Sequence, residues 1–162
     1  MLRIRDPEPS LRFYTGLCGM TLIERLTFDD MGFTLYFLAH TPDGSSSVPD
    51  DAADRVERCF DTPGTLELTH NHGTESDPNF PGYVSGNDEA MGGRGFGHIG
   101  FAVPDVRAFC DRAEKEFGCD FVKRPDDGKM KGIAFVKDPD GYWVEILNAR
   151  HSRGLVERKA QA

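Results

Sequence analysis

The second half of this chain repeats the first. Residues 65–71, an apolar strand-like run with one glutamate, resemble residues 143–148. Residues 2–6, which lead into a helix-like segment, likewise resemble residues 101–105, which lead into another. Such self-similarity indicates two copies of one structural unit. Each copy reads as a strand, a helix and then further strands, so the sequence predicts an α+β fold built from two modules.

Hydrophobic alternation and turn residues divide the chain further. The first module covers residues 1–72, with strands expected at 1–4, 20–26, 33–38 and 65–69, and with Ser10 as a candidate helix N-cap. A long, polar, glycine-rich insert covers residues 73–93. The second module covers residues 94–150, with a helix capped by Asp105, a turn at residues 138–141 and a last strand at 142–147. Residues 151–162 alternate in charge and are expected to be a loosely held tail. Together the two modules form a single domain of 162 residues.

Composition narrows the class of protein. The net charge is −8 and the pI is about 5.1, which argues against a nucleic-acid or membrane surface, because such surfaces normally carry a basic stripe. The four cysteines are widely spaced and contain no C-x-x-C motif, so they are expected to be reduced, structural thiols. No apolar run is long enough to span a bilayer. A cytoplasmic protein is therefore expected.

Three side chains on strands of the repeat, one histidine and two equivalent glutamates, point to a metal. On the strand expected to run from Arg94 through Val103, His98 shares a face with Gly100 and Ala102, and the glutamates Glu67 and Glu145 each stand between apolar neighbours. Strands rarely hold a carboxylate there without a partner. One imidazole and two carboxylates suit zinc, nickel, manganese, cobalt or iron. The simpler alternative, a histidine satisfied on a half-buried strand, remains open at this stage.

Five segments resemble glyoxalase I, the lactoylglutathione lyase family of the vicinal-oxygen-chelate superfamily. They are MLRIRDP (1–7), TLELTHN (65–71), RGFGHIG (94–100), PDDGKMKG (125–132) and DPDGYWVEIL (138–147). The resemblance covers residues 1 to about 150 and implies two βαβββ modules forming a curved mixed sheet. The long insert is similar to that of the eukaryotic-type branch, which implies zinc as the metal, with nickel, cobalt or manganese as alternatives.

The resemblance also assigns residues. It implies that Glu67, His98 and Glu145 are metal ligands, and that a fourth ligand, Gln or His, falls two positions before Met1 and so outside this chain, as the repeat also indicates. His70 and His72 are expected to be bystanders. The residues implied to contact the glutathione part of the substrate, or in the case of Phe28 to shield the intermediate from water, are Arg3, Phe28, Asn71, Arg94, Lys129 and Met130.

The implied reaction is isomerisation of the methylglyoxal–glutathione hemithioacetal to S-lactoylglutathione. Glu145 is the expected base and Glu67 the alternative, with the metal stabilising the enediolate. A homodimer with sites at the interface is implied, since the chain has only one pair of modules. Two other interpretations stay open: a weakly active or inactive glutathione-conjugate-binding protein, and a related dioxygenase or epimerase, which would need different substrate residues.

Overall fold

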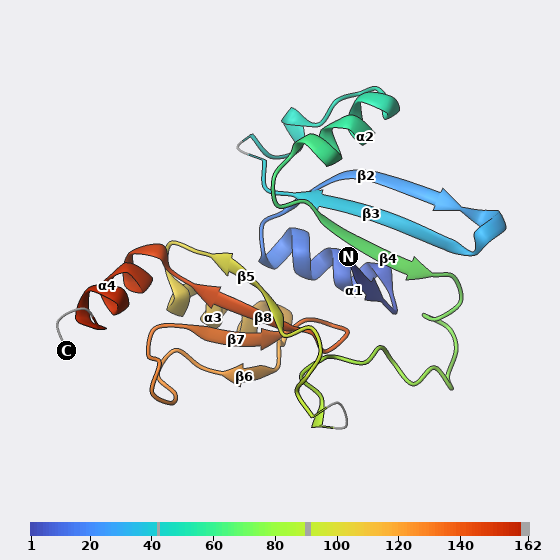
Figure 1. Cartoon of the computed structure of the whole chain (residues 1–162). Helices are drawn as coiled ribbons and strands as arrows, with labels where there is room; N and C mark the ends of the chain where they lie inside the picture. Colours follow the sequence, from blue (N-terminus) through green and yellow to red (C-terminus); the bar gives the residue numbers. More distant parts are fainter. Residues whose placement is uncertain (42, 90–91, 160–162) are drawn as a thin grey trace. The chain divides into compact units, whose positions relative to one another are not determined.

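The computed structural model describes residues 1–41, 43–89 and 92–159, and it consists of two compact units, Met1–Tyr83 and Val84–Ala162 (Figure 1). Each unit contains one four-stranded mixed sheet with helices. The fold class predicted from the repeat is therefore confirmed, although the strands form two sheets rather than a single one. The boundary between the units lies inside the expected insert, after Tyr83.

The first unit has the sheet order β1-β4-β3-β2, with β1 parallel to β4 and the other pairs antiparallel. Between β2 and β3 lies the short 3-10 helix η2, and a further helix, α2, precedes β4. In chain order the elements are β1 (Leu2–Ile4), α1 (Pro7–Leu11), the π-helix η1 (Arg12–Leu17), β2 (Thr21–Phe28), η2 (Asp29–Met31), β3 (Phe33–Ala39), the 3-10 helix η3 (Gly44–Ser47), α2 (Ala52–Asp61) and β4 (Leu66–Asn71).

The two faces of this sheet are buried differently. Ile4, Leu38 and Leu68 are fully buried on one face, against which α1 lies in Figure 1. On the opposite face, Phe37 and Ala39 pack with Cys59 of α2. Leu26 and Leu35 pack against this cluster. Because residues alternate between faces along a strand, Glu67 and Asn71 of β4 lie on the same face as Phe37.

Helix α1 begins one turn earlier than expected. Asp6 is the N-cap, and its Oδ1 accepts a hydrogen bond from the backbone N–H of Glu8 at 2.9 Å. Pro7 follows at the first helical position, where its fixed φ and missing N–H are tolerated. Ser10, the expected cap, is instead buried inside the helix with 1% of its surface exposed. The prediction for Ser10 was wrong because the Asp-Pro pair starts the helix first.

The second unit repeats the arrangement. Its sheet order is β5-β8-β7-β6, with β5 parallel to β8. Helix α3 is capped by Asp105, as predicted, and buries Val106, Cys110 and Ala113. In chain order the elements are β5 (His98–Ala102), α3 (Val106–Phe117), β6 (Phe121–Lys123), β7 (Ala134–Lys137), β8 (Trp143–Leu147) and α4 (Ala149–Lys159).

The strand register confirms the duplication residue by residue. In the first sheet Leu2 pairs with Leu68, and in the second Phe101 pairs with Ile146. These are the positions matched by the sequence repeat, so Glu67 and Glu145 are equivalent residues on β4 and β8. The metal ligands expected on these strands thus occupy corresponding positions in the two sheets.

The C-terminal segment differs from the expectation of a loose tail. Residues 149–159 form α4, whose first turn is held by Asn148: its Oδ1 accepts the backbone N–H of His151 at 3.0 Å. The imidazole of His151 hydrogen bonds to the carbonyl oxygen of Lys131 at 2.7 Å. Local charge alternation did not reveal these contacts, which join the helix to a loop 20 residues away.

Candidate functional site

His98 and Glu145 meet on the open face of the second sheet. Parallel pairing of β5 with β8 sets Gly100 opposite Glu145 and puts His98 on the same face. The His98 Nε2 and Glu145 Oε2 atoms are 3.4 Å apart, and the side chains are 40% and 21% exposed. Phe135 supports the imidazole edge-on, with the ring centroids 5.0 Å apart. Phe135 therefore restrains the imidazole on one side, and both side chains remain partly exposed, so a ligand can reach them.

Glu67 lies at the equivalent place in the first sheet. It pairs with Phe37 across β3 and is partly buried. The hydroxyl of Thr69, two residues along the same face of β4, donates a hydrogen bond to Glu67 Oε1 at 3.2 Å. This bond restrains one carboxylate oxygen and leaves the other available.

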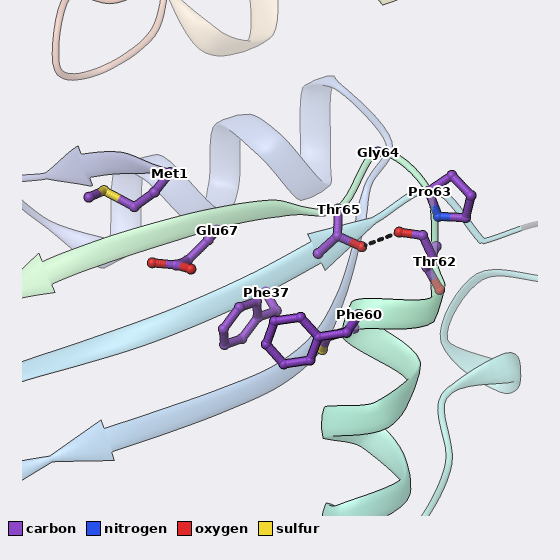
Figure 2. Close-up of a pocket in the computed structure, with 9 residues that line it drawn as sticks. Met1, Phe37, Phe60, Thr62, Pro63, Gly64, Thr65 and Glu67 are labelled. Carbon is purple, nitrogen blue, oxygen red and sulfur yellow. Dashed lines mark hydrogen bonds between the residues drawn. The ribbon is translucent and has the colours of Figure 1, made fainter.

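A cavity of about 440 Å³ opens beside Glu67 (Figure 2). Its apolar wall is formed by Phe37 and Phe60, whose ring centroids are 5.8 Å apart, and Met1 lies on the other side of the carboxylate. Phe60 is 75% exposed, which is unusual for an aromatic ring and leaves its face available to an apolar group. The cavity therefore combines one carboxylate with an apolar wall. Its lining residues are Met1, Phe37, Cys59, Phe60, Thr62, Pro63, Gly64, Thr65 and Glu67.

The expected substrate residues of the first unit share the face of Glu67. Arg3 pairs with Thr69, and Asn71 pairs with Phe33. Phe33 in turn pairs with Phe28, whose ring lies 4.9 Å from it. Since paired residues project to the same side of a sheet, Arg3, Phe28 and Asn71 all project from this face.

The expected substrate residues of the second unit lie on loops. Arg94 is exposed in the segment that leads into β5, four residues before His98. Lys129 and Met130 are exposed in the loop between β6 and β7, where Met130 is 57% exposed. The stem of this loop is closed by a hydrogen bond from the Gly132 N–H to the Pro125 carbonyl at 2.8 Å. The positions are accessible, but the structure does not bring these side chains into contact with His98 or Glu145.

The donor set suits a divalent metal. Imidazole nitrogen and carboxylate oxygen are the ligands that zinc and nickel accept in proteins, and the close His98–Glu145 pair offers one of each. Across residues 1–41, 43–89 and 92–159, however, no group of three or more His, Cys, Asp or Glu side chains gathers closely enough to hold a metal. Within the second unit, then, the structure brings together two of the three side chains expected to bind a metal, His98 and Glu145.

The other histidines near Glu67 have structural partners, as expected. His70 is 7% exposed on the opposite face of β4, and its Nε2 lies 2.8 Å from Glu75 Oε2. His72 Nε2 lies 2.9 Å from the hydroxyl of Thr34. Both imidazoles are therefore engaged away from the face that carries Glu67.

The cysteines have the properties of structural thiols, although Cys59 lines the cavity beside Glu67. None of the four forms a disulfide, and Cys18, Cys59 and Cys110 are buried. Burial raises the pKa of Cys110 to about 11, and burial also raises the pKa of Cys59. A raised thiol pKa suppresses the reactive thiolate, which agrees with the structural role expected for these residues.

Several residues near the candidate site were not predicted from the sequence. Thr69 and Phe37 could have been found, because strict alternation puts them on the face of Glu67. Phe135 could not, since its contact with His98 depends on the register between β7 and β8. No sequence pattern marked Phe60 as a cavity residue. Its place beside Phe37 depends on how α2 packs on the sheet.

A profile of the glyoxalase/bleomycin resistance protein/dioxygenase superfamily matches residues 1–146. The chain is 50% identical over 149 residues to the lactoylglutathione lyase of Pseudomonas aeruginosa, covering 92% of this chain and 80% of that protein. It is also 41% identical over 146 residues to glyoxalase I of Saccharomyces cerevisiae, covering 90% of this chain but 42% of the yeast protein.

Solved structures agree with the sequence matches. The trypanothione-dependent glyoxalase I of Leishmania major superposes with a TM-score of 0.64 at 28% identity, covering 99% of this chain and 91% of that one. Glyoxalase I of Zea mays superposes with a TM-score of 0.59 at 26% identity, covering 90% of this chain and 42% of the maize chain. Among the described residues, no helix is long and apolar enough to cross a membrane.

Proposed function

The chain belongs to the glyoxalase/bleomycin resistance protein/dioxygenase superfamily, and we propose that it is a lactoylglutathione lyase, or glyoxalase I. The reaction is the isomerisation of the methylglyoxal–glutathione hemithioacetal to S-lactoylglutathione. The observation that carries the proposal is the facing pair of His98 and Glu145, 3.4 Å apart, in a chain 50% identical to a lactoylglutathione lyase. The proposed location is the cytoplasm, where glutathione is abundant and thiols stay reduced.

The residues proposed to hold the metal are Glu67, His98 and Glu145. Their mixed nitrogen and oxygen donors favour zinc, with nickel, cobalt and manganese as alternatives. When bound, the metal supplies Lewis-acid stabilisation of negative charge on the substrate oxygens.

Glu145 is the proposed base. Its carboxylate takes the proton from the carbon that carries sulfur and returns a proton to the neighbouring carbon, so that the product is an isomer of the substrate and no net proton is consumed. His98 lies beside this carboxylate, with its Nε2 3.4 Å from Glu145 Oε2. Glu67 is the alternative base, since Thr69 leaves one of its carboxylate oxygens available.

The other proposed residues bind the glutathione part and exclude water. Arg3 and Arg94 suit its carboxylates, because a guanidinium can donate two parallel hydrogen bonds. Asn71 can donate and accept through its amide, and Lys129 adds a positive charge. Phe28 and Met130 cover the reacting part with apolar surface, which strengthens electrostatic interactions there.

Glu67 belongs to the first unit, whereas His98 and Glu145 belong to the second. We infer that the protein is a homodimer in which the ligand sets of two copies combine at the interface. In a symmetric dimer both subunits use the same surface at the interface, so one interface would complete two such sites.

The experiment that tests this function starts from metal-free protein. Formation of the thioester is followed after mixing with methylglyoxal and glutathione, before and after addition of zinc, nickel, cobalt or manganese. We expect turnover that requires one of these metals. Trypanothione in place of glutathione is the control for the thiol, because the Leishmania neighbour is described as trypanothione-dependent.

One second candidate is kept, a glutathione-conjugate-binding protein with little or no activity. Its support is the cavity of about 440 Å³ beside Glu67, which could hold an apolar substituent without any chemistry. Binding of S-hexylglutathione without turnover under any metal would favour this second function. Absence of both turnover and binding would contradict both functions.

A further inference from the structure

The segment after β4 is tied down although it contains no helix or strand. Residues 72–83 follow Asn71, and Glu75 Oε2 accepts hydrogen bonds from the Gly73 N–H at 2.9 Å and from His70 Nε2 at 2.8 Å. The hydroxyl of Thr74 donates to the carbonyl of Arg5 at 2.8 Å. These contacts join the segment to the ends of both β4 and β1.

A chain of side-chain contacts then runs from Arg5 to Tyr83. The Arg5 guanidinium donates to the carbonyls of Thr74 at 3.2 Å and Asp77 at 3.1 Å. It also lies over the ring of Phe80, 5.9 Å from the centroid. Phe80 packs edge-on against Tyr83, with the centroids 5.1 Å apart. The phenol of Tyr83 is therefore held in place by the segment that precedes it.

Tyr83, at the end of the segment, contacts Asn71, the residue just before the segment begins. The side-chain Nδ2 of Asn71 donates a hydrogen bond to the Tyr83 hydroxyl at 2.9 Å. The last torsion of asparagine is broad and roughly two-fold, so without a partner the amide oxygen and nitrogen can exchange places. The bond restrains this torsion, because the Tyr83 hydroxyl holds one end of the amide, whether it accepts from Nδ2 or donates to Oδ1. In the orientation observed, the bond uses one N–H of Asn71 and leaves its second N–H and its Oδ1 for a ligand.

We propose that Tyr83 is a positioning residue that orients the Asn71 amide for the glutathione part of the substrate. This inference rests on the proposed function, in which Asn71 binds glutathione. Tyr83 acts through Asn71 alone and takes no part in the proton transfer. Its loss should therefore weaken substrate binding and leave the chemical step unchanged.

The test compares Tyr83→Phe, which removes the hydroxyl and keeps the ring against Phe80, with Asn71→Ala and the double variant. Loss of one hydrogen bond to a bound group predicts that Tyr83→Phe raises KM about two- to tenfold while kcat stays within about twofold. In the Asn71→Ala background the same change should have no further effect. Tyr36→Phe, on the buried face of the sheet, is the control and should keep the wild-type KM.

A second readout does not depend on activity. The side-chain amide of Asn71 gives a pair of ¹H–¹⁵N signals, which are identified by their loss in Asn71→Ala. Tyr83→Phe should shift both signals, and Tyr36→Phe should not. Unshifted signals in Tyr83→Phe would overturn the inference whether or not the protein is an enzyme.

Kinetic measurements distinguish a failure of the proposed enzyme function from a failure of the proposed role of Tyr83. A wild-type protein without turnover or glutathione-conjugate binding would contradict the proposed function, and the proposed role of Tyr83 in substrate binding with it. An active wild type whose KM is unaffected by Tyr83→Phe would overturn the role of Tyr83 alone. So would an equal rise in KM with and without Asn71, because Tyr83 would then act independently of the amide.

Discussion

Glu145 and Glu67 are equivalent residues with different surroundings. Glu145 faces His98 at 3.4 Å, whereas Glu67 accepts a hydrogen bond from Thr69 and borders a cavity with an apolar wall. A carboxylate beside an imidazole can be held by that partner or released from it. A carboxylate fixed by a hydroxyl on its own strand has less freedom. This difference is the reason for proposing Glu145, rather than Glu67, as the base.

Glu145→Gln tests that choice. Loss of a general base costs about 10²- to 10⁴-fold in kcat, whereas binding of S-hexylglutathione should stay close to wild type. Metal content is measured on the same samples, since Glu145 is also a proposed ligand. A variant that keeps its metal and loses turnover supports the base role.

Glu67→Gln is the comparison variant for this experiment, because Glu67 is also a proposed ligand and is the alternative base. If Glu67→Gln loses turnover with its metal in place while Glu145→Gln stays active, the two roles are exchanged. Near-normal turnover in Glu145→Gln would remove Glu145 from the base role in any case.

Between elements, the decisive feature of the first unit is the connection after β4. Residues 72–83 are irregular, yet a carboxylate, two aromatic rings and an arginine fix them to the sheet. Glu75 is central to this because it accepts hydrogen bonds from both His70 and Gly73. The segment thus behaves as a structured extension of β4, which carries Glu67 and Asn71.

The acid sensitivity of this segment follows from the pKa of Glu75. A hydrogen bond from its own backbone N–H, and then the hydrogen bond from His70, lower this pKa below the ordinary value of 4.5. A carboxyl whose pKa is lowered on folding contributes stability above its unfolded pKa and loses it as the pH falls through the folded pKa. The wild type should therefore lose stability below about pH 4.5 more steeply than Glu75→Gln.

The measurement is urea unfolding at a series of pH values between neutral and the acid limb. Glu57→Gln, at an exposed position of α2, is the control and should keep the slope of the wild type. Equal slopes for the wild type and Glu75→Gln would mean that Glu75 does not link the segment to the sheet.

For the molecule as a whole, the central fact is that the proposed ligands are divided between two units. Each sheet repeats the same order and register, and each carries one glutamate at the same place. His98 and Glu145 form a close pair, and no group of three or more His, Cys, Asp or Glu side chains gathers among the described residues. This division of the proposed ligands is the reason for proposing that two copies of the chain combine.

Mixing two inactive variants tests the shared sites. Glu67→Gln and Glu145→Gln are each expected to be inactive, and subunit exchange should restore up to about a quarter of the wild-type activity. Half of the dimers are then mixed, and each mixed dimer holds one site with both glutamates intact.

Sedimentation of the wild type checks the dimer independently. If each site took all its ligands from one chain, every site in the mixture would keep one defect and no activity would return. A monomeric wild type with full activity would also contradict shared sites.

The local pattern of residues was enough to predict much of this protein. The repeat predicted two equivalent modules, alternation predicted that His98 shares a face with Gly100 and Ala102, and Asp105 predicted the start of α3. These properties depend on neighbours a few residues apart, so they can be read along the chain. Where two local signals competed, as with Asp6 and Ser10, the prediction failed.

Contacts between distant residues came only from the folded chain. Three contacts illustrate this, and each is between residues 12 or more positions apart. They are the ion pair of Glu24 with Arg55 of α2 at 2.7 Å, the hydrogen bond between Asn71 and Tyr83, and the close approach of His98 to Glu145. Such contacts depend on strand register, helix docking and the path of an irregular segment. No periodicity encodes them, because each is set by the packing of the unit as a whole.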